Sequence, residues 1–120
     1  MKIEVSNGEI IDKLTILQIK RERMEDAKKL ENVNREYDIL SAVSEEIIAA
    51  EDPLYKALYE INCQLWEIED RIRELEDAQD FGDEFIQTAR AVYVTNDKRA
   101  ELKKEINIKT LSLLHEEKSY

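Results

Sequence analysis

Residues 54–75 read LYKALYEINCQLWEIEDRIREL, and this stretch decides the fold. Such spacing of aliphatic residues, alternately four and three apart, places them along one stripe of an α-helix. The stripe comprises Leu54, Leu58, Ile61, Leu65, Ile68, Ile72 and Leu75. It predicts a long helix that packs lengthwise against other helices.

A second stripe runs beside the first at the same spacing and comprises Tyr55, Tyr59, Asn62 and Trp66. Two adjacent stripes require more than one neighbouring helix, which favours a bundle over a two-stranded rod. The composition agrees, because two glycines and one proline in 120 residues leave few turns for a sheet protein.

Local signals divide the chain into four predicted helices. Ser6-Asn7-Gly8-Glu9 is typical of a capping box, which starts a helix over about Asn7–Lys29. Asp52-Pro53 ends a second helix, about Asn32–Ala50, and starts a third.

The third predicted helix runs to about Ala78, and Asp80-Phe81-Gly82-Asp83 separates it from a fourth, about Asp83–Leu114. We therefore expect one all-α domain over residues 1–120. Its architecture is an antiparallel bundle of four helices, with a long coiled-coil-like hairpin of the third and fourth helices.

The net charge of the chain limits the kinds of molecule that it is expected to bind. The 28 acidic and 18 basic residues leave a net charge of −10, which repels nucleic acid and anionic membrane surfaces. Cys63 stands alone, and no segment resembles a signal peptide or a membrane span, so a cytoplasmic protein is expected. Long apolar helix faces favour a homodimer, and a further protein partner is expected without being identified.

Polar residues interrupt the apolar faces at several places. Asn96 and Arg99 fall within about 40° of Val92 on the fourth helix. Asn62 interrupts the second stripe, and three polar residues lie among the apolar residues of the first helix: Asp12, Lys13 and Thr15. We expect these groups to meet in one half-buried polar layer.

This layer has two interpretations. A buried guanidinium requires an acid, so Arg99 should pair with Asp12, Glu69 or a carboxylate of the C-terminal tail. The layer is then an internal network that sets helix register. Alternatively, the converging polar groups line a ligand pocket in the bundle.

The sequence contains few of the residues that catalysis or metal binding requires. One histidine and one cysteine do not make a zinc site, and we expect neither metal nor cofactor. Glu46 and Glu67-x-x-Asp70 are similar to part of the magnesium-binding acidic pattern of all-helical nucleotide pyrophosphohydrolases, but Ala49 stands where a further acid belongs. A mutase-like dimer of the chorismate type is a second enzymatic alternative. No catalytic residue is assigned.

Three stretches and the ending of the chain together resemble a family of small bacterial proteins that is carried as a domain of unknown function. The stretches are S-N-G-E-x-x-D-K-x-T-I-L at residues 6–17, I-N-x-x-L-W-x-I-E-D-x-I-R at 61–73 and N-D-x-R-A at 96–100, and the ending is E-E-K-S-Y at 116–120. The resemblance covers nearly the whole chain and implies no activity. It points to the polar residues Asp12, Lys13, Thr15, Asn62, Trp66, Glu69, Asp70, Asn96, Asp97 and Arg99.

The tail motif also predicts that Glu117, Lys118 or Tyr120 docks back on the bundle. The favoured function is a non-catalytic helical module for binding or assembly. The alternative is a small ligand-binding protein or enzyme that acts on an anionic metabolite through the polar layer.

Overall fold

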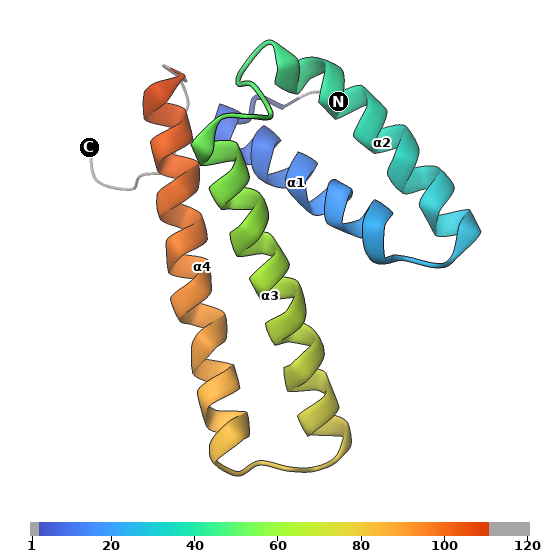
Figure 1. Cartoon of the computed structure of the whole chain (residues 1–120), viewed down its shortest axis with the longest axis vertical. Coiled ribbons are helices and arrows are strands. Elements are labelled where there is room, and N and C mark those ends of the chain that lie inside the picture. The colour runs from blue at the N-terminus through green and yellow to red at the C-terminus, as the bar shows by residue number, and fades with distance from the viewer. Residues whose placement is uncertain (1–2, 111–120) are drawn as a thin grey trace.

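The computed structural model describes residues 3–110, which form four α-helices joined by short turns. They are α1 (Asn7–Arg23), α2 (Ala27–Glu45), α3 (Pro53–Asp77) and α4 (Asp83–Lys109). Figure 1 shows α3 and α4 side by side as one long antiparallel hairpin, with α1 against one end of it and α2 on the outer side of α1. The predicted all-α bundle with a long third and fourth helix hairpin is confirmed.

Helix α1 starts where the capping box predicts. The Ser6 hydroxyl accepts a hydrogen bond from the Glu9 amide at 3.2 Å. The predicted end at Lys29 is wrong, because α1 stops at Arg23 and the chain turns at once into α2.

An N-cap at Asp26 favours the turn between α1 and α2, and this cap is not apparent from the spacing of apolar residues. Asp26 adopts extended backbone angles, and its Oδ1 accepts the amides of Lys28 at 3.0 Å and Lys29 at 3.1 Å. An aspartate that satisfies the first free amides of a helix favours a start at that point. Helix α2 therefore begins five residues before the predicted Asn32, and it ends at Glu45 rather than Ala50.

The α3–α4 hairpin is tied at its open end. Asp52 caps α3 by accepting the Leu54 amide at 2.9 Å, and Lys109 at the end of α4 donates to the other carboxylate oxygen. The hydrogen bond from Lys109 holds the pKa of Asp52 below its usual range. The predicted end of the fourth helix at Leu114 is wrong, because α4 ends at Lys109 with Thr110 as its C-cap. The predicted docking of the tail concerns residues outside the described range.

The apolar core lies where α1 crosses the hairpin. It joins α1, the turn after α2, α3 and α4 through Ile11, Leu14, Ile48, Tyr55, Leu58 and Ile106. Burial raises the pKa of Tyr55 to about 12. Within residues 3–110, no helix has both the length and the apolar character needed to cross a bilayer.

Past this core the hairpin consists of two helices alone (Figure 1). The stripe of α3 is accordingly buried in part: Leu58, Leu65 and Leu75 are buried, whereas Ile68 and Ile72 are half-buried. Two packed helices cover one seam and leave their other faces in water.

Candidate functional site

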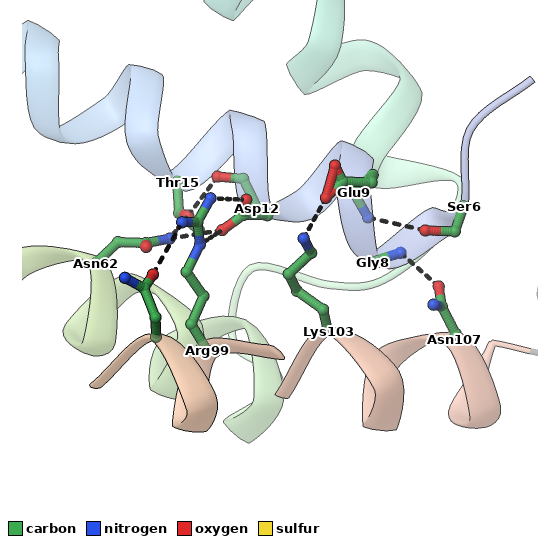
Figure 2. A network of polar contacts seen from close by, with 10 residues as sticks. Ser6, Gly8, Glu9, Asp12, Thr15, Asn62, Arg99, Lys103 and Asn107 are labelled. Carbon is green, nitrogen blue, oxygen red and sulfur yellow. Dashed lines mark hydrogen bonds and ion pairs between the residues drawn. The ribbon is translucent and has the colours of Figure 1, made fainter. Parts of the chain in front are cut away.

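Polar side chains join α1 to α4 along a line that we call the α1–α4 seam. Asn107 accepts the Gly8 amide at 2.7 Å, and Lys103 forms an ion pair with Glu9. One turn nearer the start of α4, Arg99 forms an ion pair with Asp12. Figure 2 shows these contacts in a row, with the α4 residues spaced four apart.

One end of the seam is a group of five residues that we call the Asp12 cluster: Asp12, Thr15, Asn62, Asn96 and Arg99. Arg99 grips the carboxylate with two bonds, from Nε to Oδ1 at 2.9 Å and from Nη2 to Oδ2 at 2.5 Å. The Asn62 amide donates to Asp12 Oδ1 at 2.9 Å and to the Thr15 hydroxyl at 2.8 Å. Arg99 Nη1 donates to Asn96 Oδ1 at 3.4 Å.

This geometry explains how a charge can be buried here. The Asp12 side chain is 5 % exposed, and that of Arg99 is 29 % exposed. A two-bond guanidinium pair together with an amide donor compensates for the water that Asp12 loses. In the described residues, every buried side-chain nitrogen or oxygen has a hydrogen-bond partner. Among the described residues, the cluster therefore acts chemically as a set of matched donors and acceptors that holds α1, α3 and α4 together.

The other five predicted residues lie elsewhere. Lys13 is exposed and lies 3.7 Å from Glu36 of α2, and Glu69 pairs with Arg73 one turn away on α3. Trp66 is half-buried, and both Asp70 and Asp97 are exposed. The single polar layer expected from the sequence is thus smaller than predicted.

The acidic pattern suggestive of magnesium is not assembled. Glu67 is exposed and is paired with Arg23 of α1 at 3.4 Å. Between residues 3 and 110, no three His, Cys, Asp or Glu side chains are placed to hold a metal ion.

Two seam residues were not singled out from the sequence as contact residues. A side chain at Gly8 would put its Cβ 2.4 Å from the Lys103 carbonyl oxygen, so only glycine allows α4 this close. The Asn107 side chain is buried and accepts the Gly8 amide. The sequence signal that could have identified Asn107 is its position two turns after Arg99, on the same side of α4.

A groove opens between α1 and α2, which we call the α1–α2 groove. It has a volume of about 570 Å³ and is lined by Val5, Glu9, Ile10, Asp12, Lys13, Ile16, Glu36, Ile39 and Leu40. Asp12 and Lys13 are the predicted polar residues among them. The lining is mainly aliphatic, so the groove differs in chemistry from the Asp12 cluster.

The comparisons with known proteins give a family and no activity. Neither a curated protein nor a solved structure matches the chain. The model of a family of unknown function (DUF6165) matches residues 1–120, which is the whole chain printed here. The predicted membership of an uncharacterised family is confirmed at that level. The chain therefore belongs to the family of unknown function DUF6165.

Proposed function

We propose that the protein is a non-catalytic helical module that assembles as a homodimer through the far half of its α3–α4 hairpin. One observation carries the proposal. Figure 1 shows that α4 continues past the reach of α1, and large apolar side chains of α4 are exposed over that length. Ile86 is 50 % exposed there and Tyr93 is 55 % exposed.

We call this region the far face, made of Phe85, Ile86, Ala89, Val92 and Tyr93. Successive residues of the far face are one, three, three and one positions apart in the sequence. This spacing is typical of a helix face that packs against another helix. Phe85 and Val92 are half-buried by the hairpin itself. Large apolar side chains left together in water favour association, because burying them removes apolar area from water.

A second copy of the chain fits this face. If two hairpins pair antiparallel about the midpoint between Ala89 and Arg90, Ile86 of one copy lies opposite Tyr93 of the other. The small Ala89 side chain lets the two α4 helices approach at the axis. The four helices of the two hairpins then form a bundle with a buried centre and an isologous interface.

Charge supports the antiparallel arrangement. The turn between α3 and α4 is acidic, with Asp77, Asp80 and Asp83, and all three residues are exposed. Two parallel hairpins would place these turns together and would be destabilised by repulsion. An antiparallel pair moves them to opposite ends, where the two acidic turns are far apart.

The size of the face sets the affinity. Nine residues of helix, 85–93, span roughly 14 Å. Such a contact falls below the usual size of a stable interface, about 1,200 Å² of total buried area. We therefore expect a weak dimer, with a Kd of about 1 to 100 µM.

The alternative function, an anionic metabolite bound in the predicted polar layer, has less support. The Asp12 carboxylate and the Arg99 guanidinium bind each other, so a ligand would have to separate a buried ion pair. The pyrophosphohydrolase alternative needs free acids, whereas Glu67 is paired with Arg23. The resemblance to bacterial proteins and the lone Cys63 support the setting that we propose for the module, a bacterial cytoplasm.

Analytical ultracentrifugation of the full chain over about 1 to 500 µM tests the dimer. We expect the average mass to rise from one chain toward two. Ile86→Glu, which puts a charge in the centre of the face, should stay at one chain throughout and melt as the wild type does when both are monomeric.

The matched control is Val94→Glu. Val94 is 41 % exposed on the same helix, and it lies about 100° around the helix from Tyr93. This variant should dimerise like the wild type. A wild-type protein that stays monomeric at the highest concentration, or an Ile86→Glu variant that dimerises normally, contradicts the proposal.

A further inference from the structure

The α1–α2 groove leaves aliphatic side chains in water although α1 and α2 are packed together. Ile39 of α2 is 63 % exposed, and Val5 just before α1 is 45 % exposed. Both line the groove together with Ile10, Ile16 and Leu40. A concave aliphatic surface of about 570 Å³ is large enough for several side chains of a bound segment.

One end of this groove lies beside the end of α4. Asn7 Nδ2, in the first turn of α1, donates to the Thr110 hydroxyl at 2.9 Å. Thr110 follows the last residue of α4, and its amide and hydroxyl both donate to the Ile106 carbonyl. The chain therefore leaves α4 next to Asn7, two residues from the groove residue Val5.

The next ten residues have a suitable length and chemistry. Residues 111–120 read LSLLHEEKSY and lie outside the described range. Ten extended residues reach roughly 33 Å. The α1 side of the groove, from Val5 to Ile16, is only about 17 Å long if helical. Three leucines open the segment, and polar residues follow them.

We propose that residues 111–120 bind in the α1–α2 groove of their own chain, with Leu111, Leu113 and Leu114 against its aliphatic lining. Burying these leucines removes apolar area of both the segment and the groove from water. Attachment at Thr110 holds the segment at a high effective concentration, about millimolar for a short flexible connection, so even a weak contact is occupied. This inference does not rest on the proposed dimer.

Hydrogen–deuterium exchange of the full chain, read at residues 112–118, tests the proposal. At a concentration where the protein is monomeric, we expect these amides to exchange at least about tenfold more slowly than in an unfolded chain. Ile39→Glu should remove that protection, because it puts a charge in the groove. Ile39 is exposed, so the fold should survive the substitution.

Two further variants separate the groove from general effects. Ile108→Glu changes an exposed apolar residue, 56 % exposed, that lies on α4 close to the segment and does not line the groove. It should keep the protection. Leu113→Glu, on the segment itself, should lose the protection while the amides of α1 and α3 stay as slow as in the wild type.

The outcomes that overturn the inference are distinct. Amides at 112–118 that exchange at the unfolded rate in the wild type overturn it, as does protection that persists in Ile39→Glu. Protection that disappears on dilution would assign the groove to a second copy instead. The monomeric Ile86→Glu variant should remain protected, so a failure of the dimer proposal is distinguishable from a failure of this one.

Discussion

One face of α4 has two different characters along its length. At residues 96–107 it carries Asn96, Arg99, Lys103 and Asn107, and each of them forms a hydrogen bond or an ion pair with another residue of the seam or the Asp12 cluster. At residues 85–93 the continuation of this face is apolar, with Phe85 and Val92 half-buried, and Ile86 and Tyr93 are about half exposed on the neighbouring side of the helix. The difference shows where the fold is complete within one chain and where it leaves a surface for another.

The polar half of the face specifies position. A two-bond ion pair such as Arg99–Asp12 is satisfied at one relative placement of α1 and α4, since a shift of one residue separates the pair. The apolar half tolerates small shifts, because apolar contact is not directional. The α1–α4 seam therefore sets the register within the chain, and the far face suits a weaker contact between chains.

Removing Arg99, the cation that pairs with Asp12, should give the largest change in stability. Arg99→Leu leaves the Asp12 carboxylate buried with the Asn62 amide as its remaining described side-chain donor, and we expect a loss of about 3 kcal/mol in the free energy of unfolding. Denaturant unfolding followed by circular dichroism measures it. Adding Asp12→Asn to the variant should recover part of the loss, because the uncompensated charge is then gone.

Arg73→Leu is the control for that experiment. Arg73 forms an exposed pair with Glu69, 3.1 Å apart, and its removal should change stability by less than about 0.5 kcal/mol. If Arg99→Leu also stays within that range, the seam does not set the stability of the fold and the contrast between the two halves of α4 fails.

The close approach of α1 and α4 gives the second largest expected effect. Gly8→Ala adds a Cβ that would lie 2.4 Å from the Lys103 carbonyl oxygen, so the helices must move apart. The clash should cost about 1–3 kcal/mol, which outweighs a gain of at most about 1 kcal/mol from the better helix propensity of alanine. Thermal unfolding is the measurement.

A glycine outside the seam provides the comparison. At Gly82, the N-cap of α4, a Cβ would meet only Asp80 Oδ1 at 3.4 Å, which is ordinary contact. Gly82→Ser should be neutral or slightly stabilising, because serine is a favoured N-cap. A Gly8→Ala protein as stable as this control would show that α1 and α4 can separate freely.

The smallest expected effect is at the tip of the hairpin, where α3 and α4 are joined by an exposed pair. Arg71 donates two hydrogen bonds to Glu84, at 2.8 and 2.7 Å, and they hold the pKa of Glu84 below its usual range. A carboxyl whose pKa is lowered by folding stabilises the fold above its unfolded pKa, about 4.3. That stabilisation is lost as the pH falls through the lowered value.

The comparison of wild type with Glu84→Gln from pH 7 to about pH 2 measures this effect. The wild type should be slightly more stable at pH 7, and the difference should vanish in acid. Glu101→Gln, at an exposed site of the same helix, is the reference. A difference between wild type and Glu84→Gln that stays constant down to the acid limit would contradict the role of the pair.

The helices could be predicted largely from local signals. Ser6, Asp52 and Pro53 mark helix starts through their own chemistry, and the stripe of α3 follows from a spacing within one segment. The Asp26 cap is an equally local signal. The predicted start of the second helix at Asn32 overlooks it, whereas α2 begins at Ala27, directly after Asp26.

The candidate site was predictable only in part. Arg99 in an apolar face required an acid, and the sequence left Asp12, Glu69 and the tail as alternatives. In the structure the partner of Arg99 is Asp12 of α1, which is 87 residues away in the chain. Glu69 instead pairs with Arg73 on its own helix. Burial alone distinguishes the Asp12 cluster from polar residues such as Asp70 and Asp97, which remain in water.

Helical periodicity, caps and charge are properties of neighbouring residues, so the amino-acid order alone establishes an acidic all-α protein with a long hairpin. Which groups meet across the chain depends on where α1 crosses that hairpin, and this follows from the packing of Ile11, Leu58 and Ile106 in one core. The crossing point buries Asp12 against Arg99 and leaves the far face beyond the end of α1. Both consequences are set by contacts between distant segments, which no local pattern contains.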